Sequence, residues 1–253
     1  MAEMEGKVAL VTGATSGIGR TTALKFAAEG AQVAIVARRA AELAEVAHSA
    51  DGLAKPISAD ITREADIERA VRETVDAFGG IDVLVNAAGI LASGTIETTR
   101  LQDWDYMMNL NVRAPFYLIQ CALPYLIERR GAIVNVSSVT GIRAFPGILA
   151  YCASKSAIDQ LTHCVALEVA SKGVRVNAVN PGVIVTSLHR AGGMAQEAYD
   201  KFLEHSKSTH PLGRVGQPEE VAELIYFLAS PQAGWITGIS CPIDGGRSQT
   251  CLR

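Results

Sequence analysis

One stretch decides the fold of this chain: Thr12-Gly13-Ala14-Thr15-Ser16-Gly17-Ile18-Gly19. A short apolar run, Val8–Thr12, leads into it, and a segment with helical spacing of apolar residues, Arg20–Glu29, follows it. Buried strands read as short apolar runs, whereas surface helices repeat apolar residues about every three to four positions. The local order is therefore a strand, a glycine turn and a helix.

The three glycines of this turn suit a bound phosphate. Glycine allows a tight turn and a close approach of the backbone, and a helix N-terminus offers free N–H groups and a favourable dipole. Glycines at this spacing also occur in turns that bind nothing, but their place directly after the first strand favours a dinucleotide. The residues expected to contact the cofactor phosphates are Gly13, Thr15, Ser16, Gly17, Ile18 and Gly19.

The alternation of strands and helices continues along the chain. Further apolar, β-branched runs lie at Gln32–Ala37, Ile81–Asn86, Ala132–Ser137, Arg175–Asn180 and Ile239–Ile243, with a weaker one at Leu53–Ser58, and helix-length segments separate them. Parallel neighbours need such crossovers, which are almost always right-handed. We therefore predict an α/β fold, a Rossmann-type doubly wound sheet of seven parallel strands with helices on both faces. Ligands bind such sheets at the carboxyl ends of the strands.

No repeat, low-complexity tract or linker divides the sequence, so residues 1–253 are expected to form a single domain. Its least regular part is residues 186–216, which contains paired glycines and three histidines. We interpret this part as a lid over the substrate, with a plain surface connection as the alternative. Its apolar residues Leu188, Met194 and Phe202 predict a mostly apolar pocket.

Composition and charge exclude several classes of protein. The net charge of −3 and the pI near 6.0 show no excess of positive charge, so binding to nucleic acid or to an anionic membrane surface is not expected. The five cysteines lack metal-ligand spacing, so no metal site is expected. No stretch reaches the roughly 18 to 20 apolar residues of a membrane span, and the ends at Met1–Gly6 and Cys251–Arg253 match no secretion or lipidation signal. We therefore expect a cytoplasmic protein.

The end of the second predicted strand bears on cofactor choice. Where NAD is bound, an acidic residue about 20 positions after the glycine turn holds the ribose 2′-hydroxyl, but this strand ends in Arg38 and Arg39. Guanidinium groups can instead pair with the 2′-phosphate of NADP. The alternative is a solvated arginine pair at a helix start. NADP(H) is favoured, and NAD(H) remains the second choice.

Tyr151 and Lys155 stand four residues apart in a predicted helix, Tyr151–Ala170, so both side chains project from one face. Tyrosine has a reference pKa of about 10, and a neighbouring ammonium favours its ionised form. This pair can therefore act as a general acid and base. Such a pair is also common on plain surface helices, so its setting has to support the assignment.

The setting is the predicted strand that ends at Ser137, with Ser138 following. A serine hydroxyl at the carboxyl end of a central strand can stabilise charge on a substrate oxygen. Spacing alone leaves the choice between Ser137 and Ser138 open, and either hydroxyl could simply cap the strand.

With these elements in place, the chain resembles the short-chain dehydrogenase/reductase family over essentially its whole length. The matching features are the turn Thr12–Gly19, Asp60, Asn86-Ala87-Ala88-Gly89, Asn111, Ser138, Tyr151 with Lys155, and Asn180-Pro181-Gly182 followed by Thr186. Chance occurrence of all of them in this order is negligible.

The resemblance implies a role for each matching residue. Ser138 would polarise the carbonyl, Tyr151 would transfer the proton, Lys155 would bind the nicotinamide ribose and lower the tyrosine pKa, and Asn111 would hold a relay water. The other implied cofactor contacts are Asp60 at the adenine, Asn86, Ala87 and Gly89 beside the cofactor, Pro181 and Gly182, and Ile184 and Thr186 at the nicotinamide carboxamide.

The substrate is less defined. The segments Pro211–Arg214, Pro218–Glu220 and Asp244–Gly246 look most like 3-oxoacyl-[acyl-carrier-protein] reductases, and the apolar lid residues suggest a hydrophobic carbonyl compound. The alternatives are an NAD-linked secondary-alcohol or steroid dehydrogenase and, more remotely, a non-catalytic NADP-sensing protein, which would be expected to lack the catalytic residues. The resemblance also implies a homotetramer built on the helices near 111–129 and 151–170.

Overall fold

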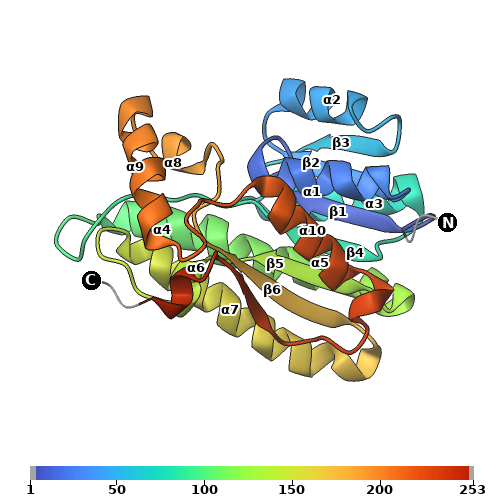
Figure 1. The fold of residues 1–253 in the computed structure, drawn as a ribbon. Helices are drawn as coiled ribbons and strands as arrows, with labels where there is room; N and C mark the ends of the chain where they lie inside the picture. Colours follow the sequence, from blue (N-terminus) through green and yellow to red (C-terminus); the bar gives the residue numbers. More distant parts are fainter. Residues whose placement is uncertain (1–3, 251–253) are drawn as a thin grey trace.

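The computed structural model describes residues 4–250 and contains one parallel sheet of seven strands (Figure 1). The strands are β1 (Val8–Thr12), β2 (Gln32–Ala37), β3 (Ala54–Ser58), β4 (Val83–Asn86), β5 (Ala132–Val136), β6 (Arg175–Pro181) and β7 (Ser240–Ile243). Their order across the sheet is β3-β2-β1-β4-β5-β6-β7, and every neighbouring pair is parallel. This confirms the predicted Rossmann-type architecture. The expectations that rest on Met1–Glu3 and Cys251–Arg253 lie outside the described residues.

Helices cover both faces of the sheet. The longer ones are α1 (Gly17–Ala28), α2 (Ala40–His48), α3 (Glu64–Phe78), α4 (Leu101–Met108), α5 (Ala114–Arg129), α7 (Leu149–Val169), α9 (Gln196–Thr209) and α10 (Pro218–Ala229). The short ones are α6 (Val139–Ile142), α8 (Leu188–Ala191), a π-helical turn at Asn109–Arg113, and 3-10 turns at Ala170–Lys172, Pro231–Ala233 and Arg247–Gln249.

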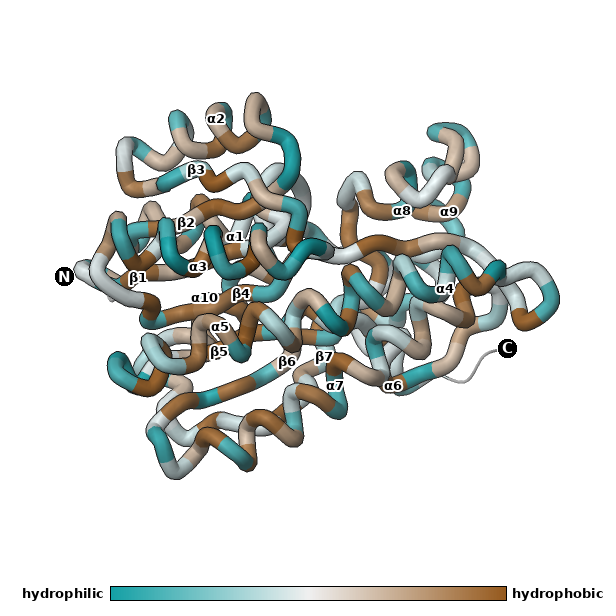
Figure 2. The backbone as a smooth tube through the Cα atoms, turned by 180° about the vertical axis from the view of Figure 1, so that it is seen from behind, coloured by the Kyte–Doolittle hydropathy of each residue, from teal (hydrophilic) through white to brown (hydrophobic). Residues whose placement is uncertain are grey.

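Two apolar layers hold this arrangement together. On one face of the sheet, Phe26 of α1, Leu43 of α2 and Ile225 of α10 are completely buried. On the other face, Ile67 of α3, Leu118 of α5 and further residues of α7 form a second cluster. Figure 2 shows the matching pattern, with hydrophobic residues along most of the strands. Such burial of both faces explains why the central strands are continuous apolar runs.

The weakest predicted strand, β3, lies at one of the two edges of the sheet. β3 pairs with β2 alone, and it contains Pro56, which cannot donate a hydrogen bond to a further neighbour. Of its five residues, Ile57 alone is buried. An edge strand with one partner needs less apolar surface, which is why its sequence signal is faint.

Residues 186–216 are more regular than their composition suggests. They form α8 and the 14-residue helix α9, which stand apart from the sheet beyond the carboxyl ends of the strands (Figure 1). Among residues 4–250, no helix combines the length and apolar character needed to cross a membrane.

Candidate active site

The glycine turn is packed against the loop that follows β4. The hydroxyl of Thr12 accepts hydrogen bonds of 3.2 Å from the N–H groups of both Ala87 and Ala88. Gly13 has a φ of +68°, and a Cβ added to it would lie 2.8 Å from the Cα of Ala88. A Cβ on Gly19 would lie 2.5 Å from the carbonyl oxygen of Gly13. These close approaches leave backbone and the start of α1 facing open space, as a bound pyrophosphate requires.

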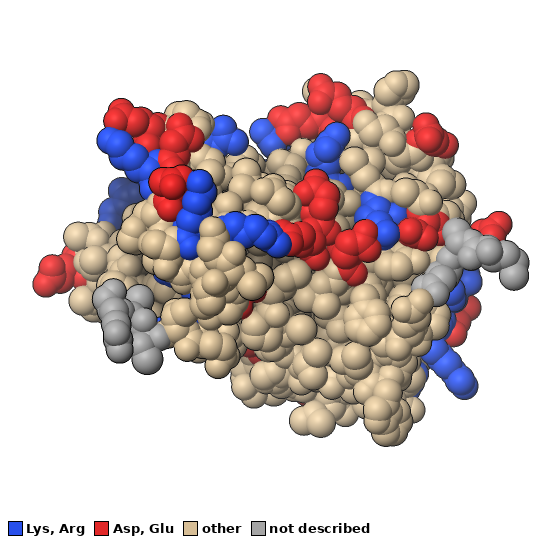
Figure 3. Space-filling view, viewed as in Figure 1, with Lys and Arg blue, Asp and Glu red and all other residues tan. Residues whose placement is uncertain are grey.

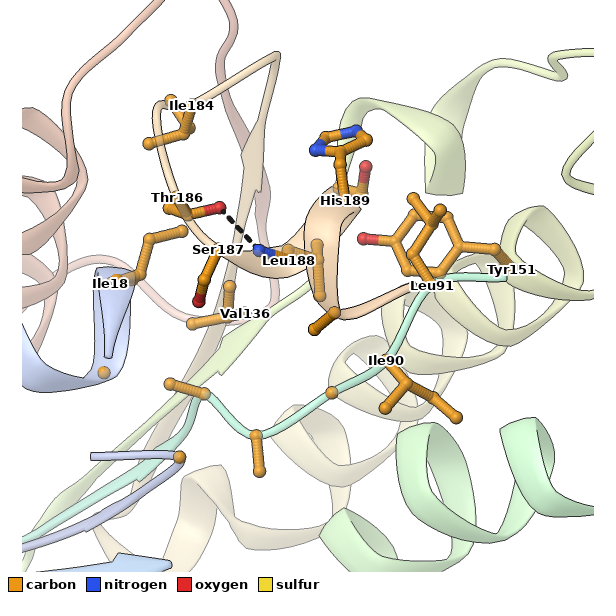
Figure 4. Close-up of a pocket in the computed structure, with 18 of the residues that line it drawn as sticks. Ile18, Ile90, Leu91, Val136, Tyr151, Ile184, Thr186, Ser187, Leu188 and His189 are labelled. Atoms are coloured by element: carbon orange, nitrogen blue, oxygen red, sulfur yellow. Dashed lines mark hydrogen bonds between the residues drawn. The ribbon is translucent and has the colours of Figure 1, made fainter. Parts of the chain in front are cut away.

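That open space is a cleft of about 990 Å³ along the carboxyl ends of the strands (Figure 4). It brings together most of the residues singled out from the sequence. The cofactor-binding candidates that line it are Gly13, Thr15, Ser16, Gly17, Ile18, Gly19, Arg38, Arg39, Asp60, Ala87, Gly89, Pro181, Gly182, Ile184 and Thr186. Ser138, Tyr151 and Lys155 line it as well. The cleft thus extends from the glycine turn to the tyrosine.

Asn86 and Asn111 lie behind the wall of the cleft. The Nδ2 atom of Asn86 donates to Asn135 Oδ1 at 2.8 Å. Asn111, in the π-helical turn, accepts the N–H of Ile90 and donates to the Ile90 carbonyl, both at 2.9 Å, and it also donates to Ser154 Oγ at 3.0 Å. Asn86 therefore ties β4 to β5, whereas Asn111 ties the loop after β4 to the first turns of α7.

The arginines after β2 have a partner that the sequence pattern did not reveal. Arg39 forms a 2.5 Å ion pair with Glu42 and lies 3.4 Å from the hydroxyl of Thr15. Arg38 donates weakly, at 3.5 Å, to the hydroxyl of Tyr106. A carboxylate is thus present beside the candidate 2′-phosphate site, on the first turn of α2.

Asp60 follows β3 at the same end of the cleft. Its Oδ1 atom accepts hydrogen bonds from the N–H of Thr62 at 3.0 Å and from the hydroxyl of Thr62 at 2.8 Å. These bonds hold the carboxylate in a turn that lines the part of the cleft beside the glycine turn, which we call the cofactor end.

Tyr151 and Lys155 lie together on α7, as their spacing predicts. Both residues are 5% exposed, and Lys155 Nζ is 5.6 Å from the centre of the Tyr151 ring. Burial raises the pKa of Tyr151 to about 12, although a hydrogen bond with Ser138 works against this rise. Burial lowers the pKa of Lys155 to about 8, opposed by the carboxylate of Asp159. Figure 4 shows the tyrosine hydroxyl inside the cleft.

The structure separates the two serines that spacing could not. Ser138 lies near enough to Tyr151 to lower the pKa of its hydroxyl, and the Ser138 Oγ atom accepts the N–H of Thr140 at 3.2 Å as the N-cap of α6. Ser137 Oγ donates instead to the backbone carbonyl of Lys155 at 3.1 Å. Ser138 is therefore the serine placed at the tyrosine hydroxyl.

Helices α8 and α9 supply the opposite wall. Leu188, Met194 and Phe202 line the cleft, whereas His205 is exposed on the outer side of α9. His189 also lines the cleft, and sequence reasoning gave it no role. Its ring centre lies 4.6 Å from that of Phe202, and its buried Nδ1 atom has no hydrogen-bond partner among residues 4–250.

Comparison with known proteins agrees with this geometry. The family model described as "Enoyl-(Acyl carrier protein) reductase" matches residues 13–248. A 3-oxoacyl-[acyl-carrier-protein] reductase of Thermotoga maritima is 42% identical over 247 residues, which cover 96% of this chain and 98% of that protein. A meso-2,3-butanediol dehydrogenase of Serratia marcescens is 36% identical over 243 residues, with coverages of 96% and 94%.

A solved structure is similar over the same length. It is a short-chain dehydrogenase/reductase of unknown function from Caenorhabditis elegans, crystallised with cofactor. It superimposes with a TM-score of 0.93 and 35% identity, covering 98% of this chain and 97% of its own. The chain therefore belongs to the short-chain dehydrogenase/reductase family of enzymes, which are carbonyl or alcohol oxidoreductases that use a nicotinamide cofactor.

Proposed function

We propose that this enzyme reduces a ketone or other carbonyl compound to a secondary alcohol at the expense of NADPH. The observation that carries the proposal is the placement of Tyr151 in the cleft with Ser138 and Lys155, where the Lys155 Nζ atom lies 5.6 Å from the centre of the Tyr151 ring. A proton donor, a hydroxyl that can bind an oxygen and a fixed positive charge thus share one site that adjoins the glycine turn.

The nicotinamide supplies the hydride when the cofactor is bound. Ser138 and Tyr151 both present hydroxyls with which they can hold the substrate oxygen while negative charge develops on it. Because its pKa is raised, Tyr151 is protonated at neutral pH and can give its proton to that oxygen. Lys155 then stabilises the phenolate, and Asn111 holds the loop after β4 against Ser154 on the helix that carries the pair.

The choice of NADP(H) rests on Arg38 and Arg39, which line the cofactor end of the cleft. Two guanidiniums suit the 2′-phosphate because they can form charge-assisted hydrogen bonds with it. The second candidate is an NAD-linked secondary-alcohol dehydrogenase. The pairing of Glu42 with Arg39 favours it, since this carboxylate reduces the positive charge there.

The substrate class is a mostly apolar carbonyl compound, with 3-oxoacyl esters as the first candidates. The part of the cleft beside Tyr151, which we call the substrate end, is mostly apolar. It is lined by residues of the lid and of the opposite wall, including Leu91, Leu188, Met194 and Phe202. The similar reductase of Thermotoga maritima is named for a 3-oxoacyl group and the similar dehydrogenase of Serratia marcescens for a vicinal diol. Both names describe an oxygen on a secondary carbon with a second oxygen nearby.

We also propose a homotetramer in which α5 and α7 pair across an interface. An open groove between α4, α5 and α7 carries Phe116, which is 49% exposed, and Leu161. Figure 3 shows a broad area without charged side chains over β6 and α7. Exposed apolar side chains such as Phe116, and surface that lacks charged groups, are typical of subunit contacts. Light scattering at micromolar concentration that gives a monomer would contradict the proposal.

The central test is the oxidation of NADPH by ethyl acetoacetate and 2,3-butanedione, followed at 340 nm, in wild type, Tyr151→Phe and the control Tyr125→Phe. We expect Tyr151→Phe to lower kcat by about 10²- to 10⁴-fold while NADPH binding stays within about threefold. Tyr125 lies on α5 outside the cleft and tests the loss of a phenol elsewhere. Equal activity in wild type and Tyr151→Phe would refute the proposed mechanism.

A further inference from the structure

The C-terminal segment folds back onto the cleft. After β7, residues Arg247–Gln249 form a 3-10 turn. The Nη1 atom of Arg143 donates to the carbonyl oxygens of Arg247 at 2.8 Å, Ser248 at 3.3 Å and Thr250. One guanidinium, from the loop between α6 and α7, therefore holds the end of the described chain in place.

This fold-back makes Arg247 part of the cleft. Its guanidinium carbon lies 5.1 Å from the centre of the Phe145 ring, and its Nη1 atom donates to the carbonyl of Thr209 at 3.1 Å. Phe145 belongs to the loop that leads into α7 and Tyr151, whereas Thr209 ends α9. Arg247 thus contacts both walls of the substrate end and is held at a fixed position between them.

Among residues 4–250, no carboxylate lies within ion-pair distance of the Arg247 guanidinium, although the charge of Asp244 attracts it. It forms no ion pair there, and Asp244, the nearest acidic neighbour in sequence, uses its carboxylate to accept the N–H groups of Gly246 and Ser248. Burial and the Arg143 charge lower the pKa of Arg247, against the attraction of Asp244. A partly buried cation that spends one of its five N–H donors on a carbonyl has capacity left for a ligand.

The other charged residues that line the substrate end are also positive. Besides Arg247, its charged lining residues are Arg190 on α8 and Lys155 beside the tyrosine. The only acidic residue described in the lining of the cleft is Asp60, which follows β3 at the cofactor end. An anionic group entering beside the lid would therefore meet positive charges only.

We propose that Arg247 binds an anionic group of the substrate, a carboxylate or a phosphate, while the substrate carbonyl lies at Tyr151. A guanidinium forms paired, charge-assisted hydrogen bonds with either anion, and stacking on Phe145 orients its plane. This inference rests on the proposed function, because it names the substrate class of the same site. It makes the C-terminal segment a determinant of specificity.

The test compares charged and neutral substrates that carry the same ketone, with NADPH and the full-length protein. The first pair is acetoacetate and methyl acetoacetate, which tests a carboxylate. The second pair is acetoacetyl-coenzyme A and the acetoacetyl thioester of N-acetylcysteamine, which tests a phosphate. The variants are Arg247→Gln and, as a matched control, Arg100→Gln, whose guanidinium pairs with Asp103 on an exposed helix start outside the cleft.

We expect Arg247→Gln to lower the charged-to-neutral ratio of kcat/KM by about tenfold or more in at least one pair, mainly through KM, because charge-assisted hydrogen bonds contribute that much. Arg100→Gln should leave the ratio as it is in wild type. Using the ratio cancels the intrinsic reactivity of each ketone. Equal loss for both members of both pairs, or no loss, would overturn the inference, because Arg247 would then only hold the tail and the lid.

A binding measurement keeps the inference testable apart from catalysis. Butanoate and inorganic phosphate are titrated by calorimetry into the protein saturated with NADP⁺. If no ketone oxidises NADPH in wild type, the proposed function fails. The inference still stands if either anion binds wild type at least about tenfold more tightly than Arg247→Gln. It fails if neither does.

Discussion

Lys155 Nζ donates a 2.8 Å hydrogen bond to the carbonyl oxygen of Val136, the last residue of β5. This bond ties the helix that carries Tyr151 to the strand that leads to Ser138. The lysine is 5% exposed and has no ion pair in residues 4–250, so burial lowers its pKa to about 8, and the Val136 carbonyl and the charge of Asp159 offset that only in part. Its proton is therefore held more weakly than that of a solvated lysine.

The pH dependence of kcat/KM should reveal how weakly Lys155 holds its proton. The pKa of Lys155 is about 8, so the ammonium is present below that value and is lost above it, whereas Tyr151, with a pKa of about 12, stays protonated throughout. We expect kcat/KM for carbonyl reduction to be flat up to about pH 8 and then to fall by about tenfold per pH unit. In Lys155→Arg the guanidinium stays charged, so the profile should stay flat to higher pH at a lower rate. A wild-type profile that is flat to pH 10 would contradict this.

The two serines give a contrast within adjacent positions. Ser138→Ala removes a hydroxyl at Tyr151, and we expect kcat to fall by about 10²-fold. Ser137→Ala removes a bond to the backbone of α7, and it should cost about 1 kcal/mol of unfolding free energy while lowering kcat by less than about fivefold. Steady-state kinetics and urea unfolding of both variants would decide the matter. A larger kcat loss for Ser137→Ala would reverse our assignment.

The features that the sequence predicts correctly are those that depend on residues close together in the chain. The glycine turn, the buried strands and the Tyr151–Lys155 spacing depend on neighbours within one element, and the structure places all of them as expected. What the sequence missed depends on side chains that meet in space. The direction of Ser137, the pairing of Glu42 with Arg39 and the return of Arg247 to the cleft are set by packing between elements, which periodicity does not encode.

Residues 186–216, interpreted as the lid, show the same limit of prediction from sequence. Gly192 and Gly193 break the helical pattern, and α9 is mostly polar, so composition alone indicated an irregular segment. Its fold follows from a few inward contacts. Tyr199 is buried on α9, and its hydroxyl both donates to the carbonyl of Thr186 and accepts the Thr186 N–H.

Glu42 should set the strength of NADPH binding. Neutralising it in Glu42→Gln removes the counter-ion of Arg39, so we expect the affinity for NADPH relative to NADH to rise about threefold to tenfold, with a smaller gain at high salt because both groups are largely exposed. The double variant Arg38→Asp/Arg39→Ala should lose the preference. Fluorescence titration of both cofactors measures this. Equal ratios in wild type and in both variants would show that these residues do not select the cofactor.

The glycine turn can be tested with a matched control. Gly13 and Gly52 both have positive φ angles, +68° and +81°, so an alanine meets similar backbone strain at either site. A Cβ at Gly13 also comes within 2.8 Å of Ala88, whereas a Cβ at Gly52 has nothing within 4 Å. We expect Gly13→Ala to cost about 1–3 kcal/mol more in urea unfolding and to weaken NADPH binding as well. Equal costs would mean that the loop after β4 yields without penalty.

His210 should make the stability of the lid depend on pH. Its Nδ1–H donates to the carbonyl of Ser206 at 2.7 Å, and its Nε2 accepts the N–H of Val183 at 3.1 Å, so α9 is joined to the loop after β6 through a neutral ring. A second proton would set the Nε2–H against the Val183 N–H. Burial, together with the Arg247 charge, lowers the pKa of His210, although the Ser206 carbonyl and Asp244 favour protonation.

Because the folded-state pKa of His210 lies below its unfolded value of about 6.5, its contribution is complete above that pH and is lost as the pH falls. We therefore expect the unfolding free energy of wild type to decrease between about pH 6.5 and pH 5 more steeply than that of His210→Gln. His205→Gln, on the exposed side of the same helix, is the control and should follow wild type. Parallel curves for wild type and His210→Gln would show that the ring accepts a proton in the folded state without loss, and that the bond to Val183 does not hold the lid.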